Sequence, residues 1–215
     1  MTGRSLGEIE ALARTAARGA GLSWGHAEDA GRAARWLEAR GLPGAALLAE
    51  LLASQQDIPY PQLIPDTARR PWTGDGAALC PVASGTAFSD LAALMRQDRE
   101  LALGPVRYPL LLLPFAAQAG AAPLALIWPG ARFDLDAEGL WQSGSEAAAA
   151  RLALAPLVTL RPGAQREPGA ERLPMVARGR MDPDTEARLR DLARRTHAPA
   201  TEHSRLAGAG TTDRD

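Results

Sequence analysis

Residues 124–142 read LALIWPGARFDLDAEGLWQ, and this stretch decides the fold class. Residues 124–128 form an apolar run, and after it Phe133, Leu135 and Leu140 alternate with polar side chains, which is typical of an antiparallel hairpin that buries one face. The dipeptides Pro129-Gly130 and Glu138-Gly139 interrupt the stretch where tight turns are expected. The stretch therefore predicts three antiparallel strands, over 124–128, 132–135 and 140–142.

Further strands are expected on both sides of this stretch. Residues 106–115 and 152–160 are apolar enough for buried strands, and a short strand is expected at 173–178. Pro156 indicates that the strand over 152–160 lies at a sheet edge or carries a bulge, because proline cannot donate a ladder hydrogen bond.

The first fifty residues predict three helices. Ser5 and Glu8 have the spacing of a capping box at the start of the first one. A second helix is expected from Trp24 to Arg40, and a third from about Pro43 to Ala53. Because the connections are short, these helices are expected to be antiparallel neighbours.

The middle of the chain changes character. Residues 57–82 contain five prolines among scattered apolar side chains, which predicts a loop packed across the surface. After it, Ser89 or Asp90 is expected to cap a short helix that ends near Met95.

Asp182 followed by Pro183 predicts the start of a C-terminal helix that runs to about Thr196. Helices segregated from an antiparallel sheet make the fold class α+β, with N-terminal antiparallel helices packed with a mostly antiparallel β-sheet and a C-terminal helix. A single domain over 1–215 is expected. Its parts are a helical part (1–56), a Pro-rich packed loop with a short helix (57–105), a β part (106–180), and a C-terminal helix with an ordered tail (181–215).

The composition excludes several kinds of chemistry. The 215 residues include no lysine, so a Schiff base, a pyridoxal phosphate anchor and a Walker-type phosphate loop are excluded. A formal net charge of −1 gives no global field that would attract nucleic acid. Arginine alternates with acidic residues along the expected helices, for example at Arg35, Glu38 and Arg40, and this pattern predicts solvated faces.

Residues 110–131 are long and apolar enough to suggest a membrane span, with Gln118 as their one polar side chain. Three prolines divide the stretch, so two buried strands joined by the turn QAGAA are expected in place of a span. The single cysteine, Cys80, suits a reducing compartment and is expected to be a small buried residue. No apolar signal sequence opens the chain, and a cytoplasmic location is therefore expected.

Two stretches concentrate groups that could bind a ligand. Residues 18–29 read RGAGLSWGHAED, where a helix N-terminus and an arginine could hold a carboxylate or phosphate. The alternative for this stretch is a plain helix–turn–helix link capped by Ser23. Residues 197–215 bring together histidine, arginine, hydroxyl and carboxylate side chains, and the alternative for them is a frayed polar terminus.

We expect the two stretches to form one cleft for an anionic metabolite. The cofactor stays unknown. No metal site is expected, because the spacing of His197, Glu202, His203, Asp213 and Asp215 matches no zinc pattern. The expected ligand-binding residues are Arg18, Gly21, Trp24, Thr201, Ser204 and Arg205, and the expected proton-transfer residues are Glu28 and Asp213.

The opening LGEIEALARTAARGAGLSWGHAEDAGRAARWLEARGLPG (6–44) and the closing RTHAPATEHSRLAGAGTTDRD (195–215) together resemble a bacterial family, domain of unknown function 3726. The resemblance implies no reaction, and it implies that the tail is ordered and belongs to the domain. Two functions are therefore expected as alternatives. The first is a small-molecule binding protein or metabolic enzyme that acts on an anionic metabolite. The second is a non-catalytic accessory subunit that contacts a partner protein or a second copy of itself.

Overall fold

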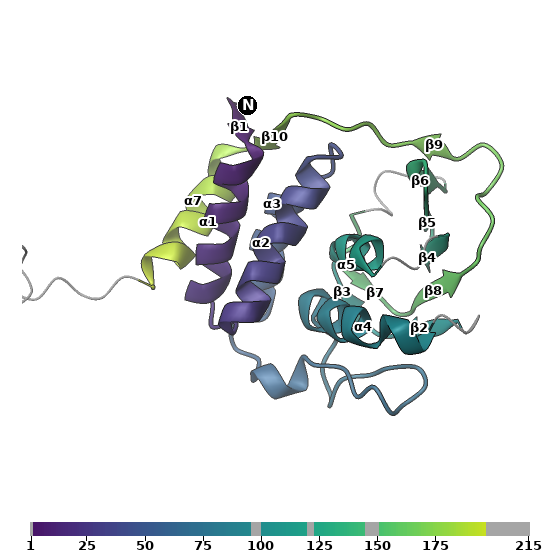
Figure 1. The fold of residues 1–215 in the computed structure, drawn as a ribbon. Helices are drawn as coiled ribbons and strands as arrows, with labels where there is room; N and C mark the ends of the chain where they lie inside the picture. The colour runs from purple at the N-terminus through teal and green to yellow at the C-terminus, as the bar shows by residue number, and fades with distance from the viewer. Residues whose placement is uncertain (1, 96–99, 120–122, 145–150, 197–215) are drawn as a thin grey trace, which may run out of the picture.

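The computed structural model describes residues 2–95, 100–119, 123–144 and 151–196. The N-terminal helices and the C-terminal helix gather on one side and an antiparallel sheet stands on the other, with helices α4 (Pro81–Met95) and α5 (Leu113–Gln118) between them (Figure 1). The predicted α+β class is confirmed. The predicted tail, residues 197–215, lies outside the described residues.

Four helices form the helical side. The predicted capping box is present, because the Ser5 hydroxyl accepts from the Glu8 backbone N–H and the Glu8 carboxylate accepts from the Ser5 backbone N–H. The predicted cap at Asp182 is also present, where the carboxylate accepts from the Thr185 backbone N–H at 2.9 Å. The helices are α1 (Leu6–Gly19), α2 (Trp24–Glu38), α3 (Gly44–Ser54) and α7 (Pro183–Arg194).

The N- and C-terminal elements of the described chain pack together. Strands β1 (Thr2–Ser5) and β10 (Arg178–Met181) pair antiparallel, and beside them Arg4 binds the Glu186 carboxylate at 2.7 and 2.8 Å. Gly19 of α1 lies directly against the backbone of Leu192 in α7. Helix α7 is therefore joined to the start of the chain by hydrogen bonds, an ion pair and close helix packing.

The main sheet has six antiparallel strands in the order β2-β8-β4-β5-β6-β9. The three strands predicted from residues 124–142 are confirmed as its β4, β5 and β6. Phe133 and Leu135 of β5 point to the core, so the polar residues between them occupy the opposite face. The strands are β2 (Leu101–Leu103), β4 (Leu124–Trp128), β5 (Ala131–Asp136), β6 (Gly139–Ser143), β8 (Val158–Pro162) and β9 (Glu171–Arg172).

The strand predicted over 106–115 is wrong. Only β3 (Val106–Arg107) is extended, and it is followed by a 3-10 turn, η2 (Pro109–Leu112), and by α5 (Leu113–Gln118). A short apolar run that is buried on every side has no periodicity to separate strand from helix, and Pro109 and Pro114 fit the first turns of these two elements. No helix in the described part of the chain is long and apolar enough to cross a membrane.

Two further expectations are wrong because prolines set the bounds of these elements. Helix α4 (Pro81–Met95) begins at Pro81, so neither Ser89 nor Asp90 caps it, and the Ser89 hydroxyl donates to the Gly85 carbonyl inside the helix. The strand expected over 152–160 is broken at Pro156 into β7 (Leu154–Ala155), which pairs with β3, and the central strand β8.

The strand predicted over 173–178 is also wrong, since most of this segment runs unpaired between β9 and β10. The loop predicted over 57–82 is packed as expected. It contains the turn η1 (Tyr60–Gln62), and it buries Trp72, whose backbone forms a parallel bridge with Leu103 at the end of strand β2.

Candidate functional site

Arg18 stabilises the turn between α1 and α2 through contacts within the turn. The Arg18 Nη1 donates to the Leu22 carbonyl at 2.7 Å, and the guanidinium lies 5.0 Å from the ring centroid of Trp24. Gly21 has a φ of +99°, which a residue with a side chain rarely adopts. The structure therefore brings together Arg18, Gly21 and Trp24, three of the expected ligand-binding residues.

Of the other expected site residues, the structure describes only Glu28. Glu28 lies one helical turn beyond Trp24 and points toward Arg32, at 3.9 Å. Ser23 caps α2 by accepting from the His26 backbone N–H, which is the plain link described as the alternative. The other expected site residues, Thr201, Ser204, Arg205 and Asp213, lie outside the described residues, as do His197, Glu202, His203 and Asp215.

Cys80 is 1% exposed and directly precedes helix α4, as expected of a small buried cysteine. Burial raises the pKa of its thiol, and the backbone N–H groups of Ala83 and Val82 offset only part of that effect.

We expect the native protein to resist thiol labelling. Cys80 should react with an aromatic disulfide reagent at least about 1,000-fold more slowly in buffer than in 8 M urea, because access requires opening of the fold. The rate is read from the absorbance of the released thiol, with Cys80→Ser as the blank. Stoichiometric labelling of the folded protein within seconds would contradict the burial of this side chain.

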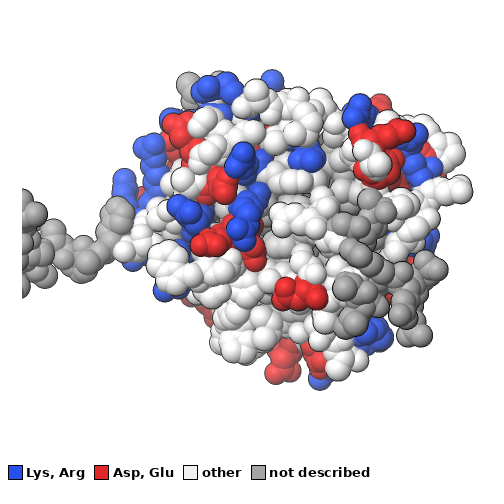
Figure 2. Space-filling model, viewed as in Figure 1, with Lys and Arg blue, Asp and Glu red and all other residues white. Residues whose placement is uncertain are grey.

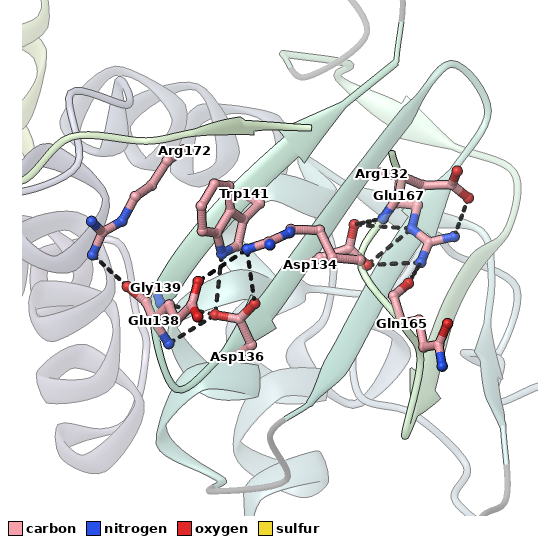
Figure 3. Close-up of polar contacts among 10 residues, drawn as sticks. Arg132, Asp134, Asp136, Glu138, Gly139, Trp141, Gln165, Glu167 and Arg172 are labelled. Atoms are coloured by element: carbon pink, nitrogen blue, oxygen red, sulfur yellow. Dashed lines mark hydrogen bonds and ion pairs between the residues drawn. The ribbon is translucent and has the colours of Figure 1, made fainter. Parts of the chain in front are cut away.

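One face of the β5–β6 hairpin carries a network of charged side chains (Figure 3). Arg132 donates from Nε and Nη2 to the carboxylate of Asp134, at 2.8 to 3.1 Å. Its Nη1 donates to the Glu167 carboxylate and its Nη2 also donates to the Gln165 carbonyl, both at 2.6 Å. The Asp134 residue is only 3% exposed. The polar face of the hairpin is thus covered here by the loop that carries Gln165 and Glu167, and both carboxylates pair with Arg132.

The same network fixes the turn of the hairpin. One oxygen of Asp136 accepts from the backbone N–H groups of Glu138 and Gly139 and from the Trp141 indole N–H, at 2.9 to 3.1 Å. Burial pushes the pKa of Asp136 up, but these hydrogen bonds and the charge of Arg166 outweigh it and hold the pKa below its ordinary value. The turn is therefore a rigid support, with a carboxylate that stays ionised.

A cleft of about 350 Å³ lies where this turn meets the end of α2. A smaller pocket of about 130 Å³ adjoins it, and the two share Arg40, Gly139 and Leu140. We call the larger space the Arg40 cleft. It is lined by Arg40, Glu138, Gly139, Leu140, Arg172, Leu173, Pro174 and Met175.

Arg40 is a half-buried cation without an acidic partner. Its guanidinium lies 3.5 Å from the ring centroid of Trp36, and its Nη1 donates to the Trp36 carbonyl at 3.1 Å. Burial lowers the pKa of this guanidinium, although the group stays charged. No carboxylate of the described chain forms an ion pair with it.

Arg172 lines the same cleft from β9. One of its nitrogens donates to the backbone carbonyl of Glu138, and its guanidinium lies 5.8 Å from the ring centroid of Trp141. The nearby Glu138 carboxylate pairs with Arg166 at 3.2 Å, not with Arg172. The cleft thus holds two guanidinium groups that lack an ion pair among residues 2–95, 100–119, 123–144 and 151–196.

The outer wall of the cleft is a segment anchored at both ends. The Leu173 backbone N–H donates to the Leu140 carbonyl at 2.9 Å, and the Val176 backbone N–H donates to the Ala39 carbonyl at 2.7 Å. Between these anchors Met175 is 69% exposed, an unusually open position for a large apolar side chain. The wall therefore presents apolar surface beside the two arginines.

Charge is unevenly distributed around this region. Figure 2 shows charged side chains gathered over the helices on the left and again at the upper right, with a mostly uncharged surface between them. The Arg40 cleft lies between helix α2 and strand β6, where the two sides of the fold meet. Among the side chains that the structure describes, no three His, Cys, Asp or Glu residues lie close enough to hold a metal ion.

The prediction from sequence missed this cleft. Glu38 and Arg40 are both expected on a solvated helix face. That expectation is wrong for both, because Glu38 is buried and Arg40 is half-buried. The spacing of Trp36 and Arg40, four residues apart at the end of α2, is the one local signal, because it allows a guanidinium to stack on an indole. Arg172 reaches the cleft only through strand pairing and carries no such signal.

The comparisons with known proteins agree with the resemblance predicted at the N-terminus. The model of a family described as "Protein of unknown function (DUF3726)" matches residues 4–74. This match confirms the resemblance over the opening stretch, and the closing stretch, 195–215, lies beyond the matched residues. No curated protein and no solved structure matches the chain.

Proposed function

We propose that the protein binds an anionic small molecule in the Arg40 cleft. The observation that carries the proposal is the pair Arg40 and Arg172, two cations that line one cleft without an acidic partner in the described part of the chain. The proposal keeps the ligand class expected from the sequence and moves the site from the α1–α2 turn to the end of α2.

The physical reason is the free-energy cost of the half-buried charge of Arg40. A guanidinium removed from water loses solvation, and that loss is recovered when a carboxylate or phosphate binds it. Stacking on Trp36 fixes the plane of the Arg40 guanidinium and leaves N–H groups at its edge. A planar guanidinium held in this way can bind a carboxylate through two parallel hydrogen bonds.

A panel of anions tests the proposal. Acetate, benzoate, octanoate, succinate and inorganic phosphate are added to the wild-type protein, and Tm and calorimetric Kd are measured. We expect at least one of these anions to raise Tm, and Arg40→Gln or Arg172→Gln to weaken its Kd by about tenfold or more, as expected for charge-assisted hydrogen bonds.

Two matched arginine variants serve as controls. Arg188→Gln removes the same charge from the exposed face of α7 and should leave Kd unchanged. Arg18→Gln tests the site expected from the sequence. If Arg18→Gln abolishes binding and Arg40→Gln does not, the ligand binds at the α1–α2 turn. If no anion raises the Tm of the wild-type protein, the proposed function is wrong.

The accessory-subunit alternative stays a prediction. In the described part of the chain, the large exposed apolar side chains away from the cleft, through which such contacts would form, are Trp24, Ile64, Leu154 and Leu157.

A further inference from the structure

We infer that the ligand of the Arg40 cleft is an amphipathic monocarboxylate, with one carboxylate at Arg40 and an apolar body that lies against Met175. This inference rests on the proposed anion site and names its ligand class. Phosphates and polyanions are the alternatives that it excludes.

The first argument is the apolar lining. Leu140, Leu173 and Pro174 form the wall that continues from the two arginines to Met175. Because both ends of the outer wall are held by backbone hydrogen bonds, Met175 stays at the rim without a partner in the core. A thioether side chain adapts readily to the shape of an apolar ligand. A ligand that is charged at one end and apolar at the other would contact both the two arginines and the exposed Met175 side chain.

The second argument is the negative charge around the cations. Glu138 lines the cleft and Asp136 lines the adjoining pocket, and both share Arg166 as their partner, at 3.2 and 3.6 Å. The three arginines Arg40, Arg172 and Arg166 thus face two carboxylates, so the charged groups around the cleft carry one net positive charge. A single carboxylate matches that net charge, whereas a ligand with two or three charges brings more negative charge than these groups balance.

A homologous series of ligands tests the inference. Calorimetric Kd values are measured with the full chain for acetate, butyrate, hexanoate and octanoate, and for inorganic phosphate and octyl phosphate. Each methylene that reaches the apolar wall should tighten binding about three- to fourfold, and octanoate should bind more tightly than octyl phosphate. Met175→Gln should weaken octanoate binding about tenfold and leave acetate or butyrate binding unchanged.

The controls separate this inference from the proposed function. Leu157→Gln removes a comparably exposed apolar side chain outside the cleft and should not alter octanoate binding. If Kd is independent of chain length, if octyl phosphate binds more tightly than octanoate, or if Met175→Gln has no effect, the inference is overturned while the anion site stands. If Arg40→Gln leaves the binding of every anion unchanged, the anion site itself is wrong.

Discussion

Gly19→Ala should lower the free energy of unfolding by about 3 kcal/mol, the upper range for overpacking a close contact. A Cβ atom at this position would lie 1.9 Å from the backbone oxygen of Leu192. That oxygen belongs to helix α7, which is also held by Arg4 through Glu186, so α7 cannot move away without losing the ion pair. Urea denaturation followed by circular dichroism gives the difference in free energy.

Gly7→Ala is the matched control on the same helix. A Cβ atom there has nothing within 4 Å, so the substitution should be neutral or stabilise the protein by about 0.5 kcal/mol through helix propensity. Equal effects at Gly7 and Gly19 would show that α1 and α7 are not in contact in solution.

Glu38→Ala should cost about 2–4 kcal/mol, because it leaves buried backbone N–H groups without acceptors. The carboxylate is 3% exposed and accepts from the backbone N–H groups of Ala45 and Arg180, at 3.1 and 3.0 Å. It therefore caps the start of α3 and fixes β10 beside α2. Urea denaturation at neutral pH measures the loss, with the exposed Glu28→Ala on the same helix as control.

The same carboxylate gives the stability a pH dependence of known sign. Burial raises the pKa of Glu38 above its ordinary value, and the backbone hydrogen bonds offset only part of this rise. The folded state therefore holds the proton more tightly than the unfolded state, and stability falls as pH rises from the ordinary glutamate pKa to the raised one. The wild-type protein should lose stability relative to Glu38→Gln across this window, and a constant difference between the two would contradict the prediction.

Sequence alone determined the elements that have their own local signals. The capping box at Ser5, the Asp182-Pro183 start of α7 and the turn signals and alternation within 124–142 each depend on neighbours within a few residues, so they could be predicted before any contact was known. The run 106–115 lacked such a signal, because a segment buried on all sides has no polar face to reveal its period.

Tertiary structure alone decided the burial of charge and the place of the cleft. Glu38 and Arg40 have the spacing of solvated helix residues, and only the packing of α3, β10 and the segment after β9 encloses them. Arg172 and Met175 lie more than 130 residues from Arg40 along the chain. The pairing of β9 with β6 and the backbone hydrogen bonds of the segment after β9 bring them to the end of α2, and no local sequence pattern encodes such contacts. Short-range sequence patterns specify backbone conformation, whereas the environment of a charge depends on every element that packs around it.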